Sequence, residues 1–232
     1  MKRILALSAS LLVAFLYCAA AGIPTSNDLS YSRDTQDLDK LDSFIRVLQQ
    51  NSNSAEMQYR LALAYSYAAE VAFEKHDKPK SETYAETGLA VAQKMVDANG
   101  KNASYHQLLG ELCGQVIPAN VLMGTIKYGK CAREEINTAI QLDPKLAIAY
   151  VSRGVGNYYL PPQMGGGPQL AIADFDKAIQ LDPNLADAYM WKGIALRKLN
   201  KDEEAHQALS RAVQIDPNRI WAKEQLAKTP AK

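Results

Sequence analysis

The chain has 232 residues, of which 47% are hydrophobic and 22% are charged, and this balance is typical of a folded globular protein and not of a disordered one. A formal net charge of +1 excludes the strongly basic surface that most nucleic-acid-binding proteins carry, so we expect no nucleic-acid partner. Alanine is unusually common along the whole chain. Because alanine has the best helix propensity and a small side chain, this excess favours closely packed helices.

Residues 1–21 have the pattern of a secretory signal peptide. Lys2 and Arg3 precede an apolar run over residues 4–17, and small residues follow. This order predicts cleavage after Ala21 and an exported chain, either periplasmic or secreted.

Two alternatives to cleavage after Ala21 concern the same segment. The apolar run is shorter than the roughly 20 residues that span a bilayer, which disfavours an uncleaved membrane anchor. A lipoprotein would be acylated on Cys18, but such signals have a small residue before the cysteine, and Tyr17 is bulky. No later segment is long and apolar enough to cross a membrane, so we expect no transmembrane segment after cleavage.

The next two segments differ in their apolar content. Residues 22–37 are rich in Thr, Ser, Asn and Asp and are predicted to be a flexible lead-in. Residues 38–54 have apolar residues at helical spacing and are predicted to form an N-terminal capping helix. The apolar positions are Leu38, Leu41, Phe44, Ile45 and Leu48.

A six-residue phrase that ends in Asp-Pro occurs three times in the second half of the chain. Its copies occupy residues 139–144, 178–183 and 212–217. The interval between Pro183 and Pro217 is about 34 residues, and the interval between Pro144 and Pro183 is slightly longer. Tyr150 and Tyr189 follow the first two copies at the same distance. This pattern resembles the tetratricopeptide repeat (TPR), a helix–turn–helix unit of the same period.

The resemblance implies an all-α fold, a right-handed TPR solenoid of about four repeats with lengthened N-terminal hairpins. Gly or Ala at position 8 of a unit is expected to face Ala at position 20, and Pro at position 32 is expected to end the second helix because proline cannot continue the hydrogen-bond ladder. A single unit cannot bury its apolar faces, so the units must stack. The repeats span 55–219 as 55–102, 103–146, 147–185 and 186–219, and a C-terminal capping helix and tail follow at 220–232.

The same resemblance implies where a partner would bind, because the first helix of each TPR unit lines a concave groove. Carried over position by position, the groove residues are Tyr59, Leu63, Tyr67, Gln107, Glu111, Val151, Val155, Tyr158, Tyr159, Met190, Ile194 and Arg197. Most are aromatic or aliphatic, and they lack the Lys, Arg and Asn set with which the family clamps a peptide carboxylate. We therefore expect a non-catalytic scaffold or adaptor that binds an apolar peptide or a partner helix. In the alternative arrangement, the N-terminal hairpin covers the groove and makes these residues part of the core.

A second functional hypothesis comes from two shorter resemblances. Residues 126–130 and the loop at 160–166 resemble exported bacterial TPR proteins, including subunits associated with TRAP-type transporters. Such an accessory protein would hold a lipid-like or other apolar small molecule. Part of the motif is also similar to the TPR region of eukaryotic microtubule-regulating proteins. The identity of the partner and the oligomeric state are left open.

The residues that catalysis or metal binding would need are scattered along the chain. His76, His106 and His206 have no other histidine or cysteine at metal-ligand spacing, so we expect no enzyme, no metal and no cofactor. Cys113 and Cys131 are the cysteines that follow the predicted signal peptide. In an exported protein they either form a disulfide or remain buried thiols.

Residues 116–123 form an apolar insertion in the second unit. Pro118 within it is expected to kink or end the first helix of that unit. The insertion either extends a buried hairpin tip or forms a contact with a partner or a second copy, and the sequence leaves both alternatives open.

Overall fold

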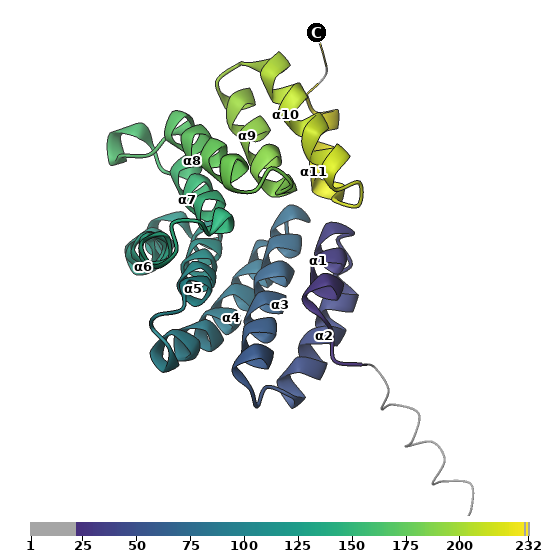
Figure 1. Ribbon diagram of the computed structural model, residues 1–232, viewed down its shortest axis with the longest axis vertical. Coiled ribbons are helices and arrows are strands. Elements are labelled where there is room, and N and C mark those ends of the chain that lie inside the picture. The colour runs from purple at the N-terminus through teal and green to yellow at the C-terminus, as the bar shows by residue number, and fades with distance from the viewer. Residues whose placement is uncertain (1–21, 230, 232) are drawn as a thin grey trace, which may run out of the picture.

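The computed structural model describes residues 22–229 and 231, and the predicted signal peptide lies outside them. Within this part of the chain every regular element is helical, which confirms the predicted all-α class (Figure 1). The elements are α1 (Ser26–Asp34), α2 (Leu38–Gln50), α3 (Ala55–Glu74), α4 (Lys78–Ala98), α5 (Ala103–Val116), the 3₁₀ helix η1 (Ile117–Ala119), α6 (Val121–Leu142), α7 (Ala147–Tyr159), the 3₁₀ helix η2 (Pro162–Met164), α8 (Pro168–Leu181), α9 (Ala186–Lys198), α10 (Asp202–Ile215) and α11 (Ile220–Ala227).

Antiparallel hairpins build the solenoid, with α3 paired to α4, α5 to α6, α7 to α8, and α9 to α10. Their first helices begin at Ala55, Ala103, Ala147 and Ala186, the residues at which the sequence places the start of each unit. The second helices α4 and α6 have 21 and 22 residues, whereas α8 and α10 each have 14. The additional residues of the first two units therefore mainly lengthen helices. In the third unit the insertion forms a turn that contains η2.

The Asp-Pro step of the repeated phrase ends the second helix of each of the last three hairpins. Asp143, Asp182 and Asp216 are the C-cap residues of α6, α8 and α10. Each aspartate Oδ1 accepts a hydrogen bond of 2.9 Å from the backbone N–H two residues further on. The proline that follows each aspartate has no N–H and cannot continue the helix. The phrase therefore encodes both the stop and the turn, which sets the start of the next helix.

Glycines at position 8 let the two helices of a hairpin meet. A Cβ on Gly110 would lie 2.7 Å from Ile136 Cγ1, and a Cβ on Gly193 would lie 2.5 Å from Leu209 Cγ. The nearest neighbour is thus the bulky residue at position 24, and the predicted contact of the glycine with the alanine at position 20 is found in the last unit. In the last unit, the carbonyl oxygen of Ala205 at position 20 is a second neighbour, at 3.0 Å.

The N-terminal segment differs from the flexible lead-in predicted over residues 22–37, because α1 forms there. A capping box between Thr25 and Asp28 fixes the start of this helix. Leu29 is fully buried and belongs to the same hydrophobic cluster as side chains of α2 and α3. The polar composition of this segment does not indicate a helix. Such a short element needs only one buried leucine and good capping to pack on its neighbours, so its sequence has little apolar periodicity.

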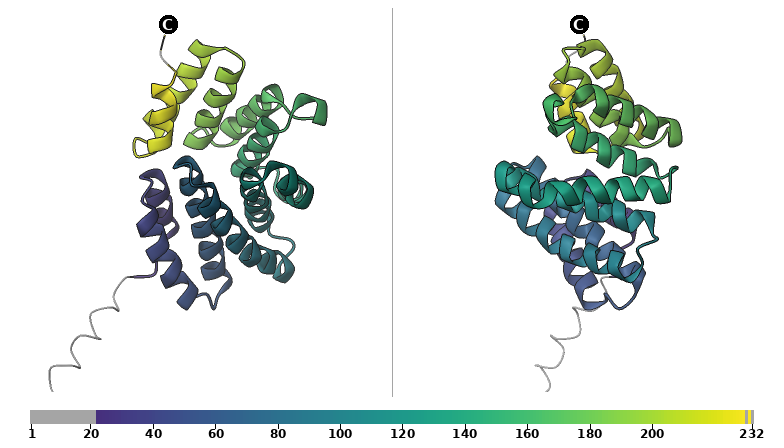
Figure 2. Two further views of the ribbon diagram at one scale, coloured as in Figure 1. Left: turned by 180° about the vertical axis from the view of Figure 1, so that it is seen from behind. Right: turned by 90° about the vertical axis from the view of Figure 1, so that its left-hand side faces the viewer.

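The hairpins follow one another around a ring, so that the N-terminal helices lie next to the C-terminal helices (Figure 1). We refer to α1–α6 as the N-terminal lobe and to α7–α11 as the C-terminal lobe; Figure 2 shows one lobe above the other, joined where α6 leads into α7. In the N-terminal lobe, α2 lies within the predicted capping segment 38–54 and packs on α3. In the C-terminal lobe, α11 packs on α10 and α9. Where the lobes meet, α1 lies beside the beginning of α11 (Figure 1).

Each lobe has a core of its own. Leu29, Leu48 and Leu112 are fully buried in the N-terminal lobe, and Phe175 and Leu209 are fully buried in the C-terminal lobe. Each lobe is therefore a stack of hairpins that buries apolar surface within itself. No helix within residues 22–229 has the length and apolar character needed to cross a membrane.

Candidate functional site

Four aromatic side chains form a continuous row across α7, α9 and α11. The ring centroids of Tyr158 and Trp191 are 5.9 Å apart, and those of Trp191 and Trp221 are 5.1 Å apart. Tyr159 meets Tyr158 edge to face at 5.0 Å and Trp191 at 6.1 Å. Tilted and edge-to-face contacts are the arrangements that the ring quadrupoles favour. We call these four residues the aromatic ladder.

The aromatic ladder is partly open to solvent. Tyr159 exposes 54% of its surface, whereas the other three rings are half-buried. Lys198 Nζ lies 4.2 Å from the centroid of the Tyr158 ring and donates to the Tyr158 carbonyl oxygen at 3.0 Å. This lysine ties the end of α9 to the end of α7 and places a positive charge at the edge of the ladder.

Sequence reasoning named the two tyrosines of the ladder and missed the two tryptophans. The missed signal was their spacing, since Trp191 and Trp221 are separated by nearly one repeat length. Residues one repeat apart come close together when the repeats stack, so two large aromatic residues at this spacing predict a contact.

Several predicted groove residues of the C-terminal lobe belong to its core. Val151, Met190 and Ile194 expose 4%, 0% and 5% of their surfaces. Met190 and Ile194 share a hydrophobic cluster with Ala222 of α11, and Val155 is half-buried in the neighbouring cluster. These side chains hold the helices of the closed structure together and are not free for a partner.

Arg197, the last predicted groove residue, fastens the C-terminal helix. It donates to Gln225 Oε1 at 2.6 Å and to Thr229 Oγ1 at 2.8 Å. A third hydrogen bond of 3.1 Å goes to the Gln225 carbonyl oxygen. The guanidinium therefore joins α9 to the end of α11.

The predicted groove residues of α3 are covered by their neighbours. Tyr59 stacks on Tyr105 of α5 with ring centroids 6.1 Å apart, and Leu63 is half-buried between two hydrophobic clusters. The guanidinium of Arg33 on α1 lies 4.8 Å from the centroid of the Tyr67 ring. Helix α1 thus covers this end of the predicted groove.

The middle of the predicted groove is polar, unlike the aromatic and aliphatic surface that the sequence predicts. Glu111 accepts hydrogen bonds from Ser66 Oγ at 2.8 Å and from Gln107 Nε2 at 2.6 Å. Ser152 of α7 donates to Glu111 Oε2 at 3.2 Å and accepts from Gln107 at 3.0 Å. Burial raises the pKa of Glu111, and the carboxylate of Glu70 raises it further. This network joins α3, α5 and α7 by hydrogen bonds.

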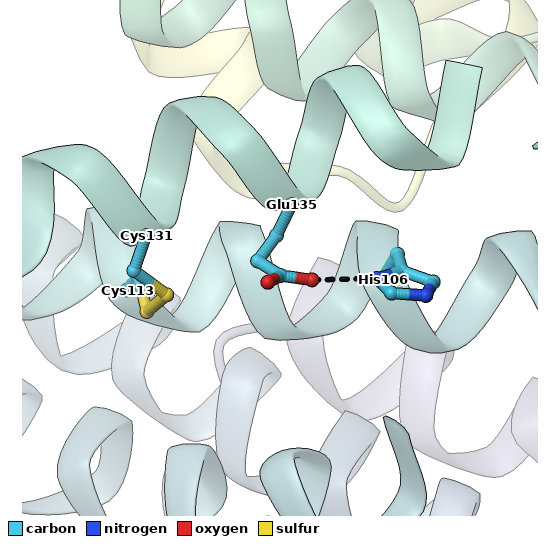
Figure 3. Close-up of a disulfide and its surroundings, with 4 residues drawn as sticks. All are labelled: His106, Cys113, Cys131 and Glu135. Carbon is cyan, nitrogen blue, oxygen red and sulfur yellow. Dashed lines mark hydrogen bonds and ion pairs between the residues drawn. A yellow bond between two sulfur atoms is a disulfide. The ribbon is translucent and has the colours of Figure 1, made fainter. Parts of the chain in front are cut away.

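Two links fasten α5 to α6 (Figure 3). Cys113 and Cys131 form a disulfide with Cα atoms 6.1 Å apart, which is one of the two states that the sequence leaves open. About two turns away, His106 Nδ1 lies 2.5 Å from Glu135 Oε2, and its Nε2 lies 3.0 Å from the Gly100 carbonyl oxygen. With both ring nitrogens paired, the histidine has a structural role. Among the residues that the structure describes, no group of three or more His, Cys, Asp or Glu side chains could hold a metal ion.

The start of α6 presents bulky apolar side chains to solvent. They are Val121, Leu122, Met123 and Ile126, which expose 66%, 71%, 58% and 70% of their surfaces. As predicted, the preceding helix ends before Pro118, which lies in η1. This part of the insertion is not a buried hairpin tip, and its contact with a partner or a second copy stays a prediction.

Stacked antiparallel helix pairs define a tetratricopeptide repeat protein. In the last three pairs an Asp-Pro step ends the second helix. Residues 166–226 match the sequence profile of this repeat. TTC0263, a TPR protein of Thermus thermophilus, has a structure that superposes with a TM-score of 0.61 at 15% identity, over 88% of this chain and 97% of that one. This likeness shows the fold alone. Proteins of the tetratricopeptide repeat family are generally non-catalytic scaffolds for protein–protein interaction.

The N-terminal part of the chain identifies its family. Residues 26–160 match the profile described as Regulator of microtubule dynamics protein 1-3, and the chain belongs to this family. Regulator of microtubule dynamics protein 3 of Bos taurus is 31% identical over 96 residues, which are 41% of this chain and 20% of the bovine protein. The match thus spans about a fifth of that relative's length. The resemblance to microtubule-regulating proteins is confirmed, and the resemblance to transporter-associated subunits stays a prediction.

Proposed function

We propose that the chain is a non-catalytic adaptor that binds an apolar segment of a partner protein on the aromatic ladder. The observation that carries the proposal is the row of four rings in mutual contact on three packed helices, with Tyr159 54% exposed. Tyrosine and tryptophan dominate the energetics of protein interfaces because they bury a large area and have few rotatable bonds. An exposed row of such rings is therefore suited to an apolar peptide or helix.

The proposed binding surface is only the C-terminal end of the predicted groove. Met190 and Ile194 are core residues, and the centre around Glu111 is polar, so an apolar segment would gain little there. Tyr158 and Tyr159 are the predicted residues that stay at the surface as part of a row. Because Lys198 lies against Tyr158 and is exposed, a partner segment with an acidic residue beside its apolar positions would bind best.

Intrinsic fluorescence tests the proposal, because the chain has two tryptophans and both belong to the ladder. The probe is a synthetic amphipathic helix of about five turns with leucines on one face and glutamates on the other. Binding should move the tryptophan emission to shorter wavelength in a saturable manner. An emission spectrum that stays constant up to millimolar peptide would contradict the proposal.

A pair of exposed tyrosines provides the matched variants. Tyr159→Ala should weaken binding of the peptide about tenfold, which corresponds to about 1.4 kcal/mol. Tyr31→Ala should leave the affinity unchanged, since Tyr31 is 59% exposed but its ring contacts none of the four rings of the ladder. Equal weakening by both substitutions would mean that the ladder is not the binding surface.

We also propose that residues 1–21 direct export and are removed. The order of charged, apolar and small residues supports this proposal, and the Cys113–Cys131 disulfide supports an oxidising compartment. Mass spectrometry of the chain from its own host should find Gly22 at the N-terminus. An N-terminus at Met1 would contradict the proposal.

A further inference from the structure

The two ends of the solenoid meet at a buried group of charges. Arg219, the N-cap residue of α11, exposes 1% of its surface. Its Nη2 donates to Glu70 Oε1 and to Glu74 Oε1, each at 2.6 Å, and its Nη1 donates to Glu74 Oε2 at 3.2 Å. These partners on α3 are 149 and 145 residues away in the sequence. A planar guanidinium bound to both oxygens of a carboxylate is the arrangement that best compensates the loss of solvent.

Arg33 of α1 makes a second link between the ends. Its Nη1 donates to Asp187 Oδ2 of α9 at 2.9 Å, and its Nε donates to Asp34 Oδ1 at 2.8 Å. Asp187 also accepts from Arg219 Nε at 3.4 Å, so the two arginines share this carboxylate. We call the network the clasp, and its members are Arg33, Asp34, Glu70, Glu74, Asp187 and Arg219.

The contact that the clasp makes is polar, whereas the lobes that it joins are apolar inside. Among the described residues, no hydrophobic cluster combines a side chain of α1–α4 with one of α9–α11. Buried ion pairs contribute little net stability, because the loss of hydration offsets most of the attraction. Opening the clasp would therefore leave both cores intact and would change the free energy much less than unfolding either lobe.

We propose that the clasp is a latch between a closed and an open form of the solenoid, and that breaking it lets the two lobes move apart about the α6–α7 connection. The lobes are the rigid bodies of such a motion, because each has its own core and the apolar contact between them is at the α6–α7 junction, where Ile140 packs against the C-terminal core. The residues uncovered would include Tyr67, which faces Asp187 of the C-terminal lobe, and the polar centre around Glu111, which Ser152 of α7 covers. The closed form therefore withholds the inner face of the solenoid from partners.

The charges of the clasp do not balance. Four carboxylates face two guanidiniums, and Tyr67 and Glu111 are the further titratable groups that face them from α3 and α5. Burial raises the pKa of Glu74 to about 7 and that of Asp34 to about 6, in spite of Arg219 and Arg33. Burial opposes ionisation of Asp187 as well, but Arg33 and Arg219 together lower its pKa.

The sign of the pH dependence follows from Glu74 and Asp34. Since the closed form binds their protons more tightly than an open form with solvated carboxyls, it is most favoured below about pH 4, where both forms are protonated. This advantage is lost as the pH rises through 6 and 7, the pKa values of Asp34 and Glu74 in the closed form. We expect the ratio of open to closed molecules to increase by roughly two to three orders of magnitude between pH 5 and pH 8, about tenfold from Asp34 and the larger part from Glu74.

Double electron–electron resonance measures the two forms directly. Nitroxide labels at Lys75→Cys and Asn218→Cys, in a Cys18→Ser background, place one exposed label beside Glu74 and the other beside Arg219. At pH 5 and low salt, the distance distribution should have a single short component. A longer component should grow at pH 8, whereas 1 M NaCl should change the distribution less, because salt screens buried ion pairs only weakly.

Three variants separate the clasp from general effects on folding. Arg219→Gln should shift most molecules to the longer component at pH 8. Arg153→Gln is the matched control, because Arg153 binds Asp174 at 3.1 Å within the C-terminal lobe, and it should leave the distribution unchanged. Glu74→Gln mimics the protonated carboxyl, so it should stay closed and remove most of the pH response.

The latch is refuted if the short component is the same in the wild type and in Arg219→Gln at every pH and salt concentration. It is also refuted if Glu74→Gln keeps the full pH response while remaining folded. Because the measurement needs no partner, its outcome is independent of whether the aromatic ladder binds a peptide.

Discussion

Gly154 and Gly156 occupy the same helix, and replacing each by alanine should have opposite effects on stability. Gly154 is at position 8 of the third unit and is buried against α8. A Cβ added there would lie 2.8 Å from Cδ1 and 2.9 Å from Cζ of Phe175. Gly156 is exposed, and a Cβ on it would meet nothing within 4 Å.

The magnitudes follow from two competing terms. Replacing glycine by alanine inside a helix stabilises by about 1 kcal/mol through backbone entropy and propensity. At Gly154 this gain is outweighed, since Phe175 is fully buried and has no space to move, and overpacking of this kind costs about 1–3 kcal/mol. We expect Gly154→Ala to lose up to about 2 kcal/mol and Gly156→Ala to gain up to about 1 kcal/mol.

Urea denaturation followed by far-ultraviolet circular dichroism measures both changes in the free energy of unfolding. For a chain of this size, each kcal/mol corresponds to a shift of about 2–4 °C in the midpoint of thermal unfolding. If Gly154→Ala were as stable as Gly156→Ala, the close approach of α7 and α8 and the repeat register that places it would be wrong.

Three further predictions use the same measurement. Ala171→Leu should cost about 1–3 kcal/mol because Ala171 is fully buried, while Ala173→Leu on the exposed side of α8 should be nearly neutral, and equal effects would refute the assigned face. Reducing the Cys113–Cys131 disulfide, whose partners are 18 residues apart, should lower the free energy of unfolding by about 3 kcal/mol, so an unchanged midpoint in reductant would speak against the bond. Leu122→Ser should change stability by less than about 0.5 kcal/mol because Leu122 is 71% exposed, and a larger loss in dilute solution would mean that this side chain is buried after all.

Much of the solenoid follows from local signals in the sequence. The Asp-Pro phrase stops a helix and sets the turn within a few residues, so the starts of α7, α9 and α11 can be predicted to the residue. The stacking of the units follows from the same period, because each hairpin needs its neighbours to bury an apolar face. The family of the chain, in contrast, is shown by the match of residues 26–160 to a family profile.

Elements outside the repeat were harder to predict. The lead-in at 22–37 has a polar composition, and α1 forms there because Leu29 fits among side chains of α2 and α3. The spacing of Thr25 and Asp28 is a capping-box signal that the sequence contains. Capping alone does not stabilise nine residues, however, so the helix depends on tertiary contacts.

The sequence by itself determined the all-α class, the repeat boundaries and the alanine and glycine positions at which helices touch, because these depend on residues that are close together in the chain. Only the tertiary structure decided which groove residues remain available. Met190 is buried because α11 packs on it, and Tyr67 is covered because Arg33 of α1 lies on its ring. The pairing of Arg219 with Glu74, 145 residues away, depends on the curvature summed over every hairpin between them, which no local pattern specifies.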